Sequence, residues 1–151
     1  NFTDFSVIKM YLLYMNWFFL IPLIKNKKRY KTIPYFFKMF SVFLGIRIIT
    51  VIVTLMPRSD KFCIMPDTIL NSLNGHCYDK IFSGHTTFTL LAVLTIDHFK
   101  IVQCTRYIWL LQIFYSITLI LSHEHYSIDI ILSYLIVIPL FHHIKNNDIF
   151  Y

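Results

Sequence analysis

Five long apolar stretches run through this chain of 151 residues and leave little room for a soluble fold. Hydrophobic residues make up 56% of the chain, whereas charged residues make up 15% and gather in short clusters between the apolar stretches. A soluble domain of this size and composition would expose large apolar patches to water. The sequence therefore predicts an integral membrane protein.

The apolar stretches predict an all-α fold, because a helix rising ~1.5 Å per residue crosses the ~30 Å hydrocarbon layer in about this length. The expected spans are 5–24, 33–56, 83–97, 107–122 and 126–144. Since there is no internal repeat or low-complexity linker, we expect residues 1–151 to form one polytopic transmembrane helix bundle and one membrane-embedded catalytic domain. The first residue is Asn1 rather than Met, so we expect an N-terminal truncation that has removed a further span.

Basic residues gather in three connecting segments, Lys25–Lys31, Asp97–Arg106 and the tail at Lys145. With five spans all three fall on one side, which the positive-inside rule makes cytosolic. The net charge of +6 is thus interpreted as a topology signal and not as nucleic-acid binding. Residues 57–82 and 123–125 are then expected on the lumenal or exoplasmic side.

Two histidine-bearing motifs begin apolar stretches on that lumenal or exoplasmic side, CYDKIFSGHTTF from Cys77 and SHEHYSIDIIL from Ser122. His125 and Asp129 are four residues apart, so a helix would place the carboxylate where it can orient the imidazole. The alternative is a histidine and an aspartate that only cap a helix at the membrane interface.

The second histidine, His85, follows Ser83 and Gly84 at the start of an expected span. The glycine suggests a close backbone approach or a bend, and the N–H groups at a helix start form an anion site. The alternative is a capped helix start with a histidine that faces solvent.

Two histidines, an aspartate and an anion site favour phosphoryl transfer, in which one imidazole attacks phosphorus and the other moves a proton. Acyl transfer is less favoured, because no serine lies in a Ser-His-Asp context. A zinc site built on His123, His125 and Asp129 is also less favoured, because histidines two residues apart point to different helix faces. No metal or other cofactor is therefore predicted.

Three segments resemble the sphingomyelin synthase family, the ceramide phosphotransferases related to the lipid phosphate phosphatase superfamily. Cys77–Thr86 is similar to the family's C-G-D-x-x-x-S-G-H-T motif, with Tyr78 in place of glycine. His125–Ile130 is similar to its H-Y-[ST]-x-D-[VI] motif, and Arg47–Pro57 resembles the segment before its lumenal loop. The resemblance implies a six-span fold that lacks its first helix here, with a lumenal or exoplasmic site in the Golgi or plasma membrane.

By the same resemblance, His125 would be the nucleophile, Asp129 its partner and His85 the second catalytic histidine. The family moves a headgroup such as phosphocholine from a glycerophospholipid to ceramide and releases diacylglycerol. Both lipids are therefore the implied partners, and a homo-oligomer is considered. The remaining candidates for substrate contact are Asp79, Arg47, Arg58, Ser83 and Gly84.

Lipid phosphate phosphatases share the histidine pattern but carry a Lys-x6-Arg-Pro segment, which this chain lacks, and an arginine where this chain has Leu119. A phosphomonoester carries more charge than a phosphodiester and favours several arginines, so their loss favours a diester donor. The alternatives kept are a lipid hydrolase and a membrane protein that binds lipid without turnover. Choline, ethanolamine and inositol headgroups stay open, as does a disulfide between Cys63 and Cys77.

Overall fold

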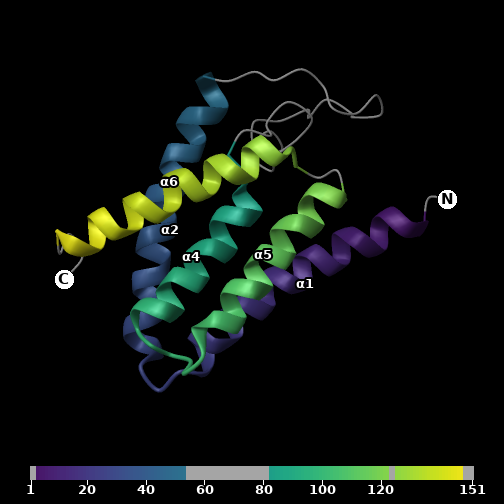
Figure 1. Cartoon of the computed structure of the whole chain (residues 1–151). Coiled ribbons are helices and arrows are strands. Elements are labelled where there is room, and N and C mark those ends of the chain that lie inside the picture. The colour runs from purple at the N-terminus through teal and green to yellow at the C-terminus, as the bar shows by residue number, and fades with distance from the viewer. Residues whose placement is uncertain (1–2, 54–81, 123–124, 148–151) are drawn as a thin grey trace.

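The computed structural model describes residues 3–53, 82–122 and 125–147. Five α-helices form there, and these residues contain no strand (Figure 1). They are α1 Thr3–Lys25, α2 Arg29–Val53, α4 Gly84–His98, α5 Thr105–Leu121 and α6 Ser127–Asn146. The all-α prediction is confirmed for the described residues, and each expected span corresponds to one helix.

Helix α4 lies at the centre and contacts α1, α2, α5 and α6. Its buried residues include Leu90 and Leu91, both 0% exposed, and the buried run continues to Ile96. A helix that is apolar on every side belongs in the interior of a bundle rather than on its surface. Four threonines are buried in α4, and the hydroxyls of three of them, Thr87, Thr89 and Thr95, donate to carbonyls of the preceding turn.

Two helical segments, Arg29–Thr50 and Ser127–Asn146, are long and apolar enough to cross a membrane, and Thr105–Leu121 is a shorter apolar helix. The outward faces of several helices are also apolar, with Trp17 59%, Phe114 57% and Leu135 65% exposed. Such a surface suits lipid better than water. The length and composition of these helices support a membrane protein, and the count of five spans stays a prediction.

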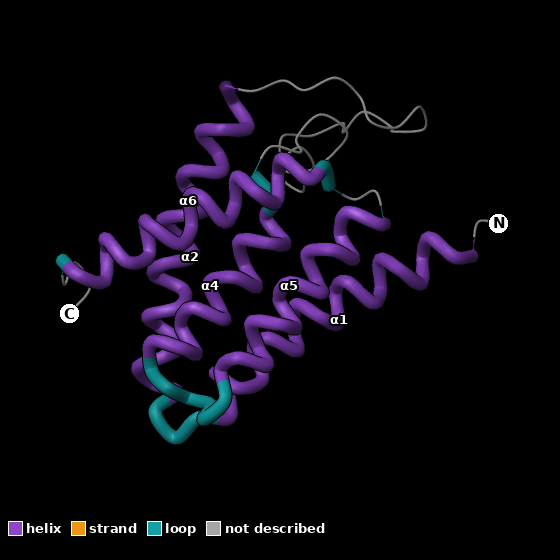
Figure 2. The backbone as a smooth tube through the Cα atoms, in the orientation of Figure 1, coloured by secondary structure: helices purple, strands orange, loops and turns teal. Residues whose placement is uncertain are grey.

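The α1–α2 turn and the α4–α5 turn lie at the same end of the bundle (Figure 2). At this end Tyr35 of α2 packs against His98 of α4 and Phe141 of α6, with ring centroids 5.4 Å and 6.1 Å away. The expected cytosolic segments therefore do share one end. The first residues of α4 and α6 lie toward the other end, which brings the two histidine motifs together.

The start of α4 is fixed by an N-cap at Ser83, whose Oγ accepts a hydrogen bond from the Thr86 N–H at 3.2 Å. We expect Ser83→Ala to lower the free energy of unfolding by about 1 kcal/mol, because one helix N–H loses its partner. Thermal unfolding in detergent micelles would measure this. Ser41→Ala is the matched control, since the exposed Ser41 hydroxyl donates to the Phe37 carbonyl oxygen of its own helix. Equal stability of the two variants would contradict the capping role.

Candidate active site

The two motif histidines lie side by side at the ends of different helices. His85 occupies the first turn of α4, and His125 stands just before α6. Their ring centroids are 5.8 Å apart, with an angle of 63° between the ring planes. His85 is exposed, whereas the side chain of His125 is 8% exposed. One atom of a substrate placed between the rings would therefore be close to both imidazoles.

Asp129 lies beneath His125 with a fully buried side chain. Its Oδ2 atom is 3.8 Å from His125 Nδ1, which is an ion-pair distance and longer than a hydrogen bond. His125 Nδ1 and Asp129 Oδ1 are both buried and have no hydrogen-bond partner within the described residues. Buried polar atoms without partners are costly, and catalytic hydrogen bonds are often long before substrate binds.

The same carboxylate also caps α6. Tyr126 is the N-cap residue in extended conformation, and its N–H donates to Asp129 Oδ2 at 3.0 Å. An acidic side chain at this position satisfies an unpaired N–H group and interacts favourably with the helix dipole. The two interpretations of Asp129, helix cap and imidazole partner, are therefore compatible in one geometry.

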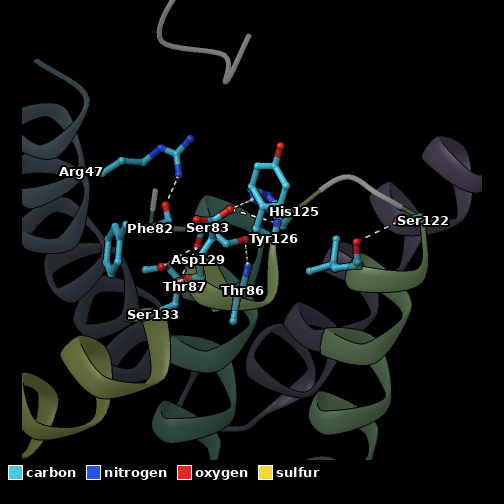
Figure 3. Close-up of polar contacts among 11 residues, drawn as sticks. Arg47, Phe82, Ser83, Thr86, Thr87, Ser122, His125, Tyr126, Asp129 and Ser133 are labelled. Atoms are coloured by element: carbon cyan, nitrogen blue, oxygen red, sulfur yellow. Dashed lines mark hydrogen bonds and ion pairs between the residues drawn. The ribbon is translucent and has the colours of Figure 1, made fainter. Parts of the chain in front are cut away.

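Arg47 reaches this cluster from α2 (Figure 3). Its Nη1 donates a hydrogen bond to the carbonyl oxygen of Phe82, the residue before the α4 cap. The guanidinium lies against Gly84, where an added Cβ atom would stand 3.0 Å from Nη1 and 3.2 Å from Cζ. The sequence suggests a close backbone approach at Gly84, and the close neighbour is this side chain.

Ser133 is a site residue that the sequence motifs did not indicate. It is fully buried, and its Oγ lies 2.8 Å from the Asp129 carbonyl oxygen and 3.4 Å from the Ser83 carbonyl oxygen. It therefore joins the first turns of α6 to the cap of α4. The available signal was its spacing, because a hydroxyl four residues after Asp129 lies on the same helix face.

Six of the predicted site residues gather here: His85, His125, Asp129, Arg47, Ser83 and Gly84. Arg58 and Asp79 lie outside the described residues, as do Cys63 and Cys77. Cys104 is a free, exposed thiol at the other end. No group of three His, Cys, Asp or Glu residues is arranged to hold a metal ion within 3–53, 82–122 and 125–147.

The chemistry of this site follows from the groups that it brings together. They are two imidazoles, a guanidinium, a helix start and a buried carboxylate. The arginine and the helix N-terminus favour an anion. One imidazole backed by a carboxylate can act as a nucleophile, and the other can exchange a proton with an oxygen. The arrangement therefore suits transfer of an anionic phosphoryl group.

Comparison with known proteins agrees with a site for phosphoryl-group transfer. The family model "PAP2 superfamily C-terminal" matches residues 76–147, which contain both histidine motifs. The chain is 27% identical over 135 residues to phosphatidylinositol:ceramide inositolphosphotransferase 3 of Arabidopsis thaliana, covering 75% of this chain and 46% of that protein. No solved structure matches the chain.

Two further relatives are 32% identical. Phosphatidylinositol:ceramide inositolphosphotransferase of Trypanosoma cruzi matches over 125 residues, or 70% of this chain and 36% of that protein. Phosphatidylcholine:ceramide cholinephosphotransferase 1 of Homo sapiens matches over 68 residues, or 43% of this chain and 16% of that protein. This chain thus spans less than half the length of each of these three relatives. The resemblance to the sphingomyelin synthase family is confirmed, and residues 76–147 match the model of the PAP2 superfamily C-terminal family.

Proposed function

We propose that this protein is a ceramide phosphotransferase, which moves a phospho-headgroup from a glycerophospholipid to ceramide and releases diacylglycerol. The observation that carries the proposal is the pair of imidazoles, His85 and His125, with ring centroids 5.8 Å apart beside the buried Asp129. The names of the relatives, all ceramide phosphotransferases, support the two substrates. Phosphocholine is the first proposed headgroup, and the inositol-type relatives make phosphoinositol its competitor.

In the first step, Nε2 of His125 attacks the phosphorus of the donor. Nδ1 is directed at Asp129, so Nε2 is the nitrogen left for attack. A phosphorus–nitrogen bond forms while the bond from phosphorus to the diacylglycerol oxygen breaks. Protonated His85 gives its proton to that oxygen, and diacylglycerol leaves as a neutral alcohol.

In the second step, His85 is neutral and removes the proton from the primary hydroxyl of ceramide. The hydroxyl oxygen attacks phosphorus, and the phosphorus–nitrogen bond to His125 breaks. The product is a phosphosphingolipid, and both histidines return to their starting protonation states. Neither step needs a metal ion, because the proton and the leaving group are both handled by imidazoles.

The phosphate is proposed to lie between the histidines and Arg47. A phosphodiester carries one negative charge, which a planar guanidinium can meet with parallel N–H donors. Ser83 and Gly84 contribute through the start of α4, where N–H groups favour an anion. Arg58 and Asp79 stay proposed substrate contacts outside the described residues.

The proposed setting is a polytopic helix bundle with this site on the lumenal or exoplasmic side of the Golgi or plasma membrane. The basic turns at the opposite end support that orientation through the positive-inside rule. Placed this way, the site would meet lipid headgroups at the membrane surface, and the lipid tails would stay within the bilayer.

The test is a product analysis with the protein reconstituted in lipid nanodiscs. We expect labelled ceramide and either phosphatidylcholine or phosphatidylinositol to give a phosphosphingolipid and diacylglycerol in a one-to-one ratio, identified by mass spectrometry. The preferred donor would identify the headgroup. Diacylglycerol with a free phosphorylated headgroup, and no phosphosphingolipid, would replace the transferase proposal by a hydrolase. Absence of both products with each donor would contradict either activity.

A further inference from the structure

We infer that Gly84 is a positioning residue for Arg47, because the missing side chain at Gly84 leaves the space in which the guanidinium lies beside His85. The catalytic part of this inference rests on the proposed function. The sequence motif alone suggested that the glycine serves the backbone, whereas the geometry points to a side chain from another helix.

The contact between Arg47 and Gly84 is close along most of the guanidinium. A Cβ atom added at Gly84 would stand 3.0 Å from Nη1, 3.2 Å from Cζ and 3.5 Å from Nε. Contacts at Nη1 and Cζ are shorter than the optimal carbon–carbon distance of about 3.5–4.0 Å, so the guanidinium would have to shift by a few tenths of an ångström to admit an alanine. Because arginine is long and flexible, the side chain would move and the helices would stay in place.

The backbone does not explain the glycine. Gly84 is the first residue of α4, and its φ lies outside the left-handed region that favours glycine. Phe82, two residues earlier, does lie in that region with φ of 67°, although it is a bulky residue. The backbone conformation therefore does not require a glycine at position 84, whereas the positive φ at position 82 would favour one and the chain has Phe82 there.

The Phe82 conformation serves the same contact. Its carbonyl oxygen accepts the hydrogen bond from Arg47 Nη1, as Figure 3 shows, and its side chain is fully buried. A buried residue held in an unfavourable conformation is a common feature of sites that fix a neighbouring group. The Phe82 carbonyl oxygen therefore holds the guanidinium by a hydrogen bond, and the absence of a side chain at Gly84 leaves space for it.

The chain offers a matched control glycine. Gly45 lies in α2, two residues before Arg47, and an added Cβ there would have nothing within 4 Å. Gly→Ala in a helix normally stabilises the folded state, since alanine is the better helix former. Gly45→Ala should therefore raise or maintain the thermal midpoint and leave headgroup transfer unchanged. Gly84→Ala should lose the stability gain, because the new methyl group displaces Arg47.

The contact itself is tested by thermal unfolding in nanodiscs. We expect Gly84→Ala to raise the midpoint more in an Arg47→Ala background than in the wild-type background, whereas Gly45→Ala should have the same effect on it in both. This cycle does not depend on catalysis. Equal effects of Gly84→Ala in the two backgrounds would show that the two residues do not compete for space, and would overturn the inference.

The positioning role is tested by kinetics. We expect Gly84→Ala to lower kcat/KM for headgroup transfer by roughly 3- to 10-fold, because the guanidinium must shift by a few tenths of an ångström and a misplacement of ~1 Å can cost about 100-fold. Combined with Arg47→Lys, it should add little to the loss from Arg47→Lys alone. An active wild-type protein with full activity in Gly84→Ala, or strictly additive losses, would overturn the positioning role. An inactive wild-type protein would instead contradict the proposed function, while the thermal cycle still decides the contact.

Discussion

Replacing His125 with alanine is expected to lower headgroup transfer by about a thousandfold or more, since the variant loses the proposed nucleophile. The imidazole is 8% exposed and is directed by a buried carboxylate, so neither solvent nor a neighbouring group would take its place easily. The measurement is kcat/KM in nanodiscs, together with a search for acid-labile phosphate on the protein after incubation with donor alone. Wild type should carry this phosphate, and His125→Ala should not.

The control for this variant is His143→Ala, which removes an exposed imidazole from the last turn of α6. His143 bonds only locally to Asn147 among the contacts described, so its loss should leave transfer unchanged. His85→Ala should form phosphoprotein and release diacylglycerol together and slowly, because both occur in the one step that needs the proton of His85. Substantial transfer by His125→Ala would exclude it as the nucleophile, and phosphate retained on that variant would point to His85.

The helices could be predicted from the sequence because the apolar stretches are long and the breaks between them are polar. The bounds were less accurate at the basic turn, where α2 starts at Arg29 and the expected span started at Ile33. Lysine and arginine are good helix formers, so a helix can continue past the edge of its apolar part. The turn itself is short, and its Lys28 N–H donates to the Asn26 side chain at 3.2 Å.

The pairing of His85 with His125 followed from topology, because the two helices that separate them, α4 and α5, return the chain to the same end of the bundle. The contact of Arg47 with Gly84 had no such basis. It depends on how α2 packs against α4, and on the conformation of Phe82, which sequence propensity disfavours. Ser133 was missed for a similar reason, since a serine in an apolar helix gives no sign of the neighbour it will meet. Local spacing thus located the catalytic candidates, whereas contacts between distant helices needed the structure.

Asp129→Asn is expected to lower headgroup transfer by about 10²- to 10⁴-fold while leaving the fold intact. The amide oxygen of asparagine can still accept the Tyr126 N–H, so the cap of α6 at Asp129 Oδ2 is retained. The negative charge that orients His125 and stabilises its charged form is lost. Transfer rates and thermal midpoints of wild type and variant would be measured in the same nanodiscs.

Asp129→Ala separates the two roles of this carboxylate, because alanine removes both the charge and the cap. It should be as inactive as Asp129→Asn and should also unfold at a lower temperature, in line with the loss of about 1 kcal/mol typical of an N-terminal cap. If Asp129→Asn kept wild-type transfer and only Asp129→Ala were impaired, the aspartate would be a cap alone. His125 would then need another group to fix its tautomer, and Asp129 would have to be removed from the proposed mechanism.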